Sequence, residues 1–547
     1  MDPYSYTWLF AIGLVLAFAD AFGIGSNDVA NSFATSVGSR SLTFKQAVGI
    51  AVFTEFGGAV LLGAGVADTI KNKIISINQF ADAPEALMLA FVCALFGSAI
   101  WVNAASHYGW PVSTTHSITG AIAGAGVAAF GINTVEWSWK GMGQIAASWF
   151  ISPIVAGIFA AIIYSFTKYG IMRAKNSLKR ALMTIPVYIF FTLFLCIMYI
   201  ILKGGQSKTL ANKVNMIAGI AAGVAGAVAI WAFIFYVPWI RRKVQDEENL
   251  RWYHVFYTPF VPVQEKDAGY AERLDNLYKE HGKAFVVKEG QQPAEGEKEG
   301  EASVVSVDKT SDVTITEEPA HATASLAKLD EKPARTYNPF VIVKNIFNDN
   351  LNRDVVSLQS QHVADIHARA VRYESKTEHL YSFTQILTAS FASFAHGSND
   401  VSNAVGPLAA IYAIWESGVL PKSSVPVPIW ILVLGGIAID FGLIFVGWRI
   451  MQKLGNNLTY HTPSRGFSME FGAALTVISA SYMQLPVSTT HCITGATVGV
   501  GLCNGNLKAV NWRMIAWCFF GWILTVPCAG VIAGCMFALL SRAPKIL

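Results

Sequence analysis

Two copies of one polar motif stand inside apolar stretches of this chain. The first reads GSNDVANS at Gly25–Ser32, and the second reads GSNDVSNA at Gly397–Ala404. An ionisable side chain at membrane depth is costly unless it is paired or solvated, so Asp28 and Asp400 are candidate functional residues. Their carboxylate oxygens are hard ligands, which small cations prefer. The motifs therefore predict a pair of cation sites.

Amide side chains accompany each carboxylate. Asn27 and Asn31 lie four positions apart in the first copy, as do Asn399 and Asn403 in the second, so each pair shares one face of a helix. Because Gly and Asn interrupt the apolar run, we expect the helix to break at each motif and to free carbonyl oxygens as further ligands. The alternative, that Asn and Asp only cap helices, does not account for two matched copies.

A second duplicated motif is rich in hydroxyl groups. It reads PVSTTH at Pro111–His116 and again at Pro486–His491. Proline followed by Ser or Thr is typical of a helix start, and the free N–H groups of a helix N-terminus attract an oxyanion. We expect two half-helices to approach one anion from opposite sides, with ordinary capping as the alternative. The hydroxyl candidates are Ser113, Thr114, Thr115, Ser488, Thr489 and Thr490.

The histidine that ends each hydroxyl motif has two interpretations. His116 and His491 are candidate proton carriers, and the alternative is a hydrogen-bonded structural role. Ser113 and His116 share a helix face, but the chain has no GxSxG nucleophile elbow, so a hydrolase is not expected. We predict that the protein is not an enzyme.

Both motifs keep their order and spacing in the two halves of the chain. Asp28 precedes Pro111 by 83 positions, and Asp400 precedes Pro486 by 86. The first copy begins in the first apolar stretch and the second in the eighth, and an odd offset turns the second copy upside down in a membrane. Inverted repeats are an architecture of secondary transporters, which hold substrate and ions near the midplane. The repeat favours a transporter over a receptor or a scaffold.

Further carboxylates lie in apolar surroundings. Glu55 and Glu470 are the clearest cases, together with Asp20 and Asp440. Acidic groups repel an anion, and no Lys or Arg lies deep within a motif-bearing stretch. The neutralising charge must then come from bound cations or protons. This electrostatic argument predicts cation-coupled uptake of an anion.

The composition is that of a membrane protein. Of the 547 residues, 53% are hydrophobic and 14% are charged, against roughly 25% charged in an average soluble domain. Apolar stretches of membrane-spanning length account for the difference. They are roughly residues 5–36, 46–68, 85–106, 111–131, 144–167, 183–203, 213–240, 381–413, 427–450, 467–483, 486–504 and 512–541. We predict an all-α membrane protein with about 12 transmembrane helices in two inverted repeats.

Other classes of function lack their sequence marks. There is no Walker loop or GxGxxG fingerprint, so transport would be driven by a gradient and not by a nucleotide. A formal net charge of +4 without a basic cluster gives no reason to expect nucleic-acid binding. The seven cysteines lack paired metal spacing, and no cofactor is predicted.

A hydrophilic segment separates the two membrane halves. It divides the chain into residues 1–240, 241–380 and 381–547, and its run Glu289–Glu301 has the low complexity of a disordered region. Basic residues gather between Lys168 and Arg180 and at Arg241–Lys243, and such loops stay cytoplasmic. We therefore expect the 241–380 loop inside the cell and both termini outside.

The two motifs together resemble those of the PiT family of inorganic phosphate transporters. The family's marks are a GANDVANS element and then a PVSTTH element, repeated around a large hydrophilic loop, and the likeness covers both membrane halves. Ser26, Ser398 and Ser402 stand where the family usually has Ala.

The resemblance implies symport of sodium and inorganic phosphate by alternating access, in the plasma membrane. It implies phosphate held near Asp28, Asp400 and the six hydroxyl residues of the PVSTTH motifs. It implies that Glu55 and Glu470 are required for transport. The side chains expected around sodium are Asn27, Asp28, Asn31, Glu55, Asn399, Asp400, Asn403 and Glu470.

Two alternatives stay open at this point. One is the same transporter driven by protons, and the other is a membrane sensor that binds phosphate without moving it. Another tetrahedral oxyanion, such as sulfate, is separable only by competition. Whether two copies pair as a homodimer in the bilayer is not readable from the sequence.

Overall fold

The computed structural model describes residues 2–65, 74–139, 141–204, 214–279, 345, 347–356, 360–420, 427–482 and 487–542. The chain separates into two compact units, one of Met1–Phe285 with Phe347–Leu547 and the other of Val286–Ile346. The run Glu289–Glu301, predicted to be disordered, lies outside the described residues. The fold below is that of the first unit, and the predicted boundaries at 240 and 380 stay a prediction.

The described residues are helical, with three isolated β-bridges and no strand among them. The first half contains α1 (Thr7–Ile24), the π-helical turn η1 (Gly25–Val29), α2 (Ala30–Gly38), α3 (Phe44–Leu62), α5 (Pro84–His107), α6 (Thr114–Phe130), α7 (Met142–Thr167), α8 (Ser177–Gly204), α10 (Val214–Trp231) and α11 (Val237–Val244). After the short α12 (Tyr270–Lys279), α14 (Gln361–Ala368) and α15 (Ser375–Leu380), the second half contains α16 (Ser382–Ser417), α17 (Ile429–Val446), α18 (Trp448–Asn457), α19 (Pro463–Tyr482), α20 (Thr489–Leu502) and α21 (Trp512–Leu540).

Every predicted apolar stretch coincides with a helix, which confirms the all-α membrane class. Eight helical stretches in the described part of the chain are long and apolar enough to cross a bilayer: Thr7–Gly38, Phe44–Leu62, Pro84–His107, Met142–Met172, Ser177–Leu202, Val214–Val244, Ile429–Val446 and Trp512–Leu540. Among the described helices of 14 residues or more, those outside this set are α6, α16, α19 and α20, which carry PVSTTH motifs, the second GSND motif or Glu470. Twelve crossings and the inverted orientation of the repeats therefore stay predictions.

Two helical hairpins carry the PVSTTH motifs at their bends. In the first, α5 and α6 run side by side, and a bridge between Ile75 and Val135 joins the two ends of the hairpin. In the second, α19 and α20 pack together, and Thr459 bridges Val510 in the same way. Helix α6 has 17 residues and α20 has 14, so at 1.5 Å per residue each is shorter than the roughly 30 Å hydrocarbon core. They have the length of half-helices.

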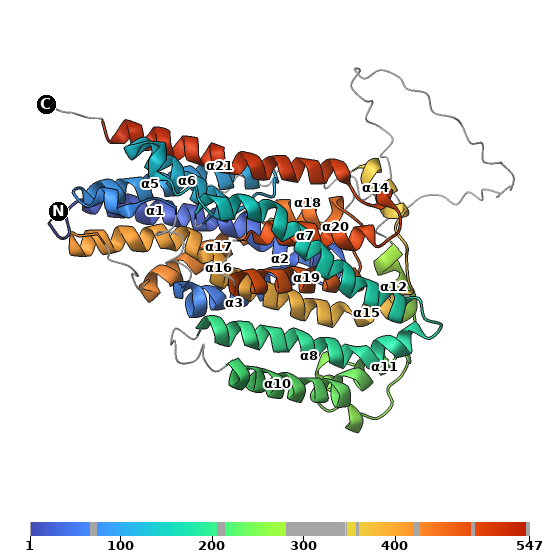
Figure 1. The fold of residues 1–547 in the computed structure, drawn as a ribbon. Coiled ribbons are helices and arrows are strands. Elements are labelled where there is room, and N and C mark those ends of the chain that lie inside the picture. Colours follow the sequence, from blue (N-terminus) through green and yellow to red (C-terminus); the bar gives the residue numbers. More distant parts are fainter. Residues whose placement is uncertain are drawn as a thin grey trace, which may run out of the picture. The chain divides into compact units, whose positions relative to one another are not determined.

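Each half-helix packs on a helix of the other half of the chain. Helix α6 packs on α21, and α20 packs on α7, and α5, α6 and α21 run together in Figure 1. Both contacts depend on glycine. A Cβ atom on Gly124 would lie 2.0 Å from the carbonyl oxygen of Gly530, and one on Gly499 would lie 2.2 Å from that of Gly157. Only glycine lets these backbones approach so closely.

The helix does not break at either GSND motif, contrary to our expectation. In the first copy a single π-helical turn, Gly25–Val29, widens a helix that otherwise continues from α1 into α2. In the second copy α16 runs without interruption through Gly397. The glycines serve packing instead. A Cβ on Gly25 would lie 1.8 Å from the carbonyl oxygen of Ile439, and one on Gly397 would lie 2.2 Å from that of Glu55.

Candidate functional site

The N-termini of the two half-helices are capped in the same way. Ser113 precedes α6 and accepts a hydrogen bond from the backbone N–H of His116 at 3.3 Å, and Ser488 precedes α20 and accepts one from His491 at 3.4 Å. The predicted helix starts are thus present, and these two serines act as caps. Pro486, the first residue of the second motif, lies outside the described residues.

Asn27 holds the first bend against the GSND motif. Its amide donates to the carbonyl oxygen of Trp110 at 2.9 Å and to Ser106 at 3.1 Å, and its oxygen accepts from the N–H of Val112 at 3.1 Å. The side chain is fully buried. The sequence predicts Asn27 as a cation ligand, which stays a prediction; in the structure its amide makes the hydrogen bonds that position the bend.

The two carboxylates each accept a hydrogen bond from the first threonine of their own half's hydroxyl motif. Thr114 donates to Asp28 at 2.5 Å, and Thr489 donates to Asp400 at 3.2 Å. Thr490 adds a second bond to Asp28 at 2.8 Å, across from the other half. Both carboxylates are buried. The predicted meeting of the two motifs is present, at the N-termini of α6 and α20.

The second amide of each GSND motif reaches across to the opposite half. Asn31 donates to Thr490 at 2.7 Å, and Asn403 donates to Thr115 at 3.1 Å. Since Thr490 and Thr115 occupy the same position in the two copies of PVSTTH, the pairing has twofold regularity. Asn399, in contrast, donates to its neighbour Asp400 at 2.9 Å. The crossed pairs tie the two halves together around one point.

His396 joins this cluster and was not singled out in the sequence. Its Nε2 lies 2.7 Å from a carboxylate oxygen of Asp400, and its Nδ1 lies 3.0 Å from one of Glu55. One ligand atom from each of Asp28, His396 and Asp400 lies within 4.8 Å of the other two. The available signal was the spacing of four between His396 and Asp400, which places both on one helix face. The site therefore contains a basic group, the imidazole of His396, which a count of Lys and Arg in the apolar stretches does not include.

The two predicted glutamates occupy different surroundings. Glu55, on α3, belongs to the cluster through His396 and also accepts from Ser393 at 2.7 Å. Glu470, on α19, is buried and belongs to a separate polar group. Its carboxylate accepts from Thr35, Ser36, Gln385 and Thr388, at 2.6, 2.7, 3.2 and 2.6 Å.

A small cavity connects the two polar groups. It measures about 40 Å³, and its lining includes Asn31, His396, Glu470 and Thr489. Asp20 and Asp440 are also buried, but neither belongs to the three-residue cluster around His396. The site thus centres on the duplicated motifs, and Glu470 borders it from α19.

His116 and His491 face each other beside the site. Their ring centroids are 4.9 Å apart, and His491 also lies 3.9 Å from the ring centroid of Trp522. Trp149 lies 5.6 Å from His116. The ring nitrogens of both histidines make no hydrogen bond within the described part of the chain. The hydrogen-bonded structural role offered as an alternative is thus not seen there, and Ser113 makes no side-chain pair with His116.

The three serines that depart from the family pattern point away from the cluster. Ser26 donates to the carbonyl oxygen of Gly23 at 2.9 Å, and Ser398 donates to that of Ala395 at 2.7 Å. Ser402 donates to the carbonyl oxygen of Asn399. Each hydroxyl donates to a carbonyl oxygen three residues back on its own helix, and Ser398 also pairs with the Tyr199 hydroxyl at 3.0 Å.

Comparison with known proteins gives one consistent result. The sequence profile of the phosphate transporter family matches residues 24–533. The phosphate-repressible phosphate permease pho-4 of Neurospora crassa is 41% identical, over 100% of this chain and 99% of the permease. Sodium-dependent phosphate transporter 2 of Homo sapiens is 30% identical, with 98% of each chain covered. A solved structure of a sodium-dependent phosphate transporter has 28% identity and a TM-score of 0.65, with 98% of this chain and 99% of that chain covered.

Proposed function

The chain belongs to the phosphate transporter family, and from this premise we propose that it couples inward movement of sodium to uptake of inorganic phosphate. The observation that carries the proposal is the meeting of Asp28 and Asp400 with the threonines at the N-termini of α6 and α20. Such an arrangement combines groups for an oxyanion with groups for cations at one buried point. Relatives named as sodium-dependent phosphate transporters support the choice of both ions.

Phosphate would be held at the two half-helix N-termini. The backbone N–H groups there are preorganised donors, and the partial positive charge of each terminus favours an anion. Thr114, Thr115, Thr489 and Thr490 supply hydroxyl groups at this place, while Ser113 and Ser488 keep the termini in shape through their caps. The threonine hydroxyls now bonded to carboxylates would turn to phosphate when it binds.

Sodium would occupy positions between the anion and the carboxylates. Without cations, Asp28 and Asp400 would repel phosphate across a low-dielectric site. Asn31 and Asn403 offer amide oxygens beside them, and Asn399 adjoins Asp400. We assign Asn27 the task of positioning the bend. We propose Glu55 and Glu470 as flanking carboxylates, Glu55 through His396 and Glu470 at the neighbouring cavity.

Transport would proceed by alternating access in the plasma membrane. The two hairpins, α5–α6 and α19–α20, hold the site between the halves, so their movement relative to α1 and α16 would open it to one side at a time. From the basic residues near Lys168 and Arg241 we propose that the 241–380 loop is cytoplasmic and that both termini are extracellular.

Uptake by purified protein in liposomes tests the proposal. We expect radiolabelled phosphate to accumulate under an inward sodium gradient and not under a matched potassium gradient at the same pH. Asp28→Asn should lose at least about 90% of this uptake, because removing a buried charge from a coupled site removes the cation that offsets phosphate. Asp82→Asn is the matched control, since Asp82 is exposed and should keep full uptake.

The remaining outcomes separate the alternatives. His396, whose ring nitrogens lie 3.0 Å from a carboxylate oxygen of Glu55 and 2.7 Å from one of Asp400, is the observation that favours proton coupling as a second candidate. Accumulation driven by a proton gradient without sodium would establish that candidate and refute sodium coupling. Phosphate binding by folded protein with no flux under either gradient would identify a sensor.

A further inference from the structure

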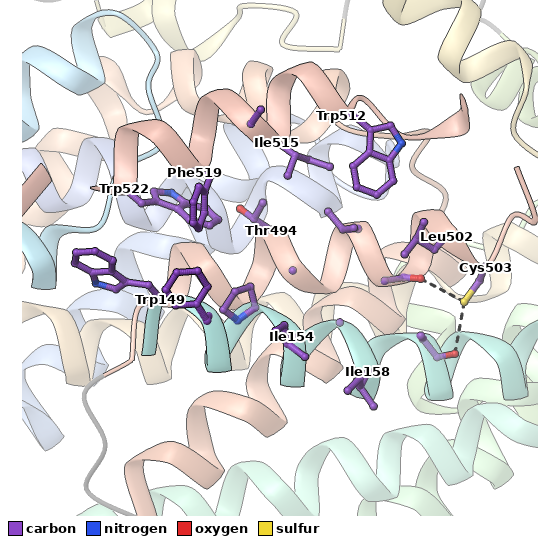
Figure 2. Close-up of a pocket in the computed structure, with 18 residues that line it drawn as sticks. Trp149, Ile154, Ile158, Thr494, Leu502, Cys503, Trp512, Ile515, Phe519 and Trp522 are labelled. Atoms are coloured by element: carbon purple, nitrogen blue, oxygen red, sulfur yellow. Dashed lines mark hydrogen bonds between the residues drawn. The ribbon is translucent and has the colours of Figure 1, made fainter. Parts of the chain in front are cut away.

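An apolar groove runs along the outer face of the second half-helix. Its volume is about 800 Å³, and Figure 2 shows it between α7, α20 and α21. Ile154 and Ile158 line it from α7, Leu502 from α20, and Ile515 and Phe519 from α21. The volume is within the range of a small-molecule site, but the lining offers almost only hydrocarbon and aromatic surface.

The groove exists because a half-helix separates two full-length helices. Helix α20 packs tightly on α7, where Gly499 meets the backbone of Gly157, while α21 packs on α6 and α5. Small residues on α20, including Gly495 and Val498, form the floor. Among the described residues, the aromatic side chains of α7 and α21 line this space without filling it.

The length of the groove matches one leaflet of a bilayer. Along α21 it extends from Trp512 to Trp522, ten residues or roughly 15 Å of helix, which is about half of a 30 Å hydrocarbon core. Both walls, α7 and α21, are stretches able to span a membrane, and Ile158 and Phe520 on their outer faces are each 53% exposed. The groove thus opens where lipid chains would surround the protein.

The two ends of the groove differ. One end lies where α21 begins, beside Trp512, and the neighbouring Lys508 and Arg513 are exposed. Trp, Lys and Arg are typical of the level of lipid headgroups. At the other end Trp522 closes the groove, its ring lies tilted against that of His491 with centroids 3.9 Å apart, and it donates to the carbonyl oxygen of Pro111 at 3.2 Å. A chain entering at Trp512 would end against the wall of the PVSTTH motifs.

We propose that this groove is a binding site for one acyl chain of a phospholipid, with the headgroup beside Trp512, Lys508 and Arg513. A void here would leave its apolar walls without dispersion contacts, and a lipid chain restores those contacts. The chain would also press on Trp522 and so support the packing around His491 and the first bend. The inference does not depend on which ions the protein moves.

Photocrosslinking in a lipid environment tests this site. The full-length protein is placed in nanodiscs of phosphatidylcholine that contain a small fraction of phosphatidylcholine with a diazirine in its acyl chain. After illumination, labelled residues are located by mass spectrometry. We expect labels on Ile154, Ile158, Leu502 and Ile515 at least fivefold above those on other lipid-facing residues.

Two variants on α21 make the test specific. Ala516→Trp fills the groove, which Ala516 lines, and should reduce labelling of α7 and α20 at least fivefold. Cys535→Trp adds the same side chain at an exposed position outside the groove and should leave labelling unchanged. Ile158→Trp fills the groove from α7 and serves as a second variant, and size-exclusion profiles establish that each protein is folded.

Three results would overturn the proposal. Labels spread evenly over all exposed apolar faces would indicate only annular lipid. Unchanged groove labelling in both folded filling variants would place the chain elsewhere. If the groove residues were not labelled by the lipid probe and crosslinks formed between two copies of the protein, a second molecule of this protein would occupy the groove.

Discussion

At the scale of single residues, the site consists of hydrogen-bonded polar pairs, and each pair from the first half of the chain has a counterpart from the second half. Asp28 with Thr114 corresponds to Asp400 with Thr489, and the crossed amide bonds from Asn31 and Asn403 follow the same rule. Buried polar groups must be satisfied, and these hydrogen bonds satisfy carboxylate oxygens of Asp28 and Asp400 within the chain.

His396 breaks this regularity. The offset that relates Asp28 to Asp400 places Ile24 opposite His396, so only the second half has an imidazole between two carboxylates. The two halves are therefore chemically unequal, even where their backbones correspond. One consequence is that the two carboxylates are not interchangeable: Asp400 lies 2.7 Å from the imidazole, whereas Asp28 accepts hydrogen bonds from two threonines.

Replacing this histidine should separate its role from that of the carboxylates. We expect His396→Gln to lower sodium-driven phosphate uptake at least about tenfold, because it leaves Glu55 or Asp400 without its buried partner. His362→Gln is the matched control, since His362 is exposed on α14. Uptake in liposomes and the thermal unfolding midpoint are measured together. Unchanged uptake by folded His396→Gln would remove His396 from the site.

At the scale of helices, glycine positions determine how the halves fit. Gly25 lies against α17 and Gly397 against α3, each with a backbone carbonyl where a side chain would start. From the sequence alone, both glycines are predicted to break their helices. Glycine permits both a break and a close approach, and the local sequence does not distinguish them, because the neighbouring helix comes from a distant part of the chain.

A pair of alanine substitutions tests this assignment. Gly25→Ala should destabilise the protein by about 3 kcal/mol or more, since its Cβ would overlap the Ile439 carbonyl and rigid backbone would have to move. Gly49→Ala on α3 is the control, because its Cβ would meet nothing within 4 Å. Thermal unfolding in detergent measures both. A Gly25→Ala protein as stable as the wild type would contradict the packing interpretation.

The segment after α11 offers a pH-dependent test outside the membrane spans. Glu248 accepts hydrogen bonds from Arg242 at 2.6 Å and from the N–H of Gln264 at 2.9 Å. The Arg242 guanidinium lowers the pKa of the Glu248 carboxyl below its ordinary value of 4.5. The stability from this carboxylate is therefore present above about pH 4.5 and is lost as pH falls through the lower pKa of the folded state.

Glu248→Gln should show this dependence. We expect the free energy of unfolding of the variant to be about 1.5–3 kcal/mol lower at pH 7, the usual contribution of a hydrogen bond to a charged group. The difference from the wild type should shrink as pH is lowered from 5 to 3. Glu265→Gln, next to the bridge partner Lys266, is the control, since Glu265 is exposed. If the free energy of unfolding differed between wild type and variant by the same amount at every pH, the ion pair between Arg242 and Glu248 would be excluded as the cause of that difference.

At the scale of the whole molecule, the two halves are built into each other. The half-helix of each repeat packs on the long helix that follows the other half-helix, α6 on α21 and α20 on α7. Likewise α1 packs on α17, and α16 on α3. A movement of one hairpin must therefore be transmitted to the other half, which suits a site that opens to one side at a time.

The orientation in the membrane gives a prediction at this scale. Epitope tags placed at either terminus should be accessible on intact cells, and a tag within residues 286–346 should become accessible only after permeabilisation. The reason is the gathering of basic residues at Lys168–Arg180 and Arg241–Lys243, which stay cytoplasmic. If the loop tag were accessible on intact cells and the tags at the termini were not, the protein would have the opposite orientation in the membrane.

The membrane class, the positions of the helices and the two motifs of the candidate site could all be predicted from the sequence. These features are local: hydropathy sets where a helix can lie in a bilayer, and Ser or Thr after proline marks a helix start. Even the resemblance to phosphate transporters rested on short motifs. Each of these features could be predicted because it depends only on residues that are close together in the sequence.

Which side chains contact each other could not be predicted from the sequence and is seen in the tertiary structure. Asn31 bonds Thr490 across 459 positions, and Asn403 bonds Thr115 across 288. The period of a helix tells which residues share a face, but not which helix that face contacts. For the same reason the structure alone revealed His396 between Asp400 and Glu55, and the groove beside α20. Contacts between distant segments depend on packing of the whole chain, which no local pattern encodes.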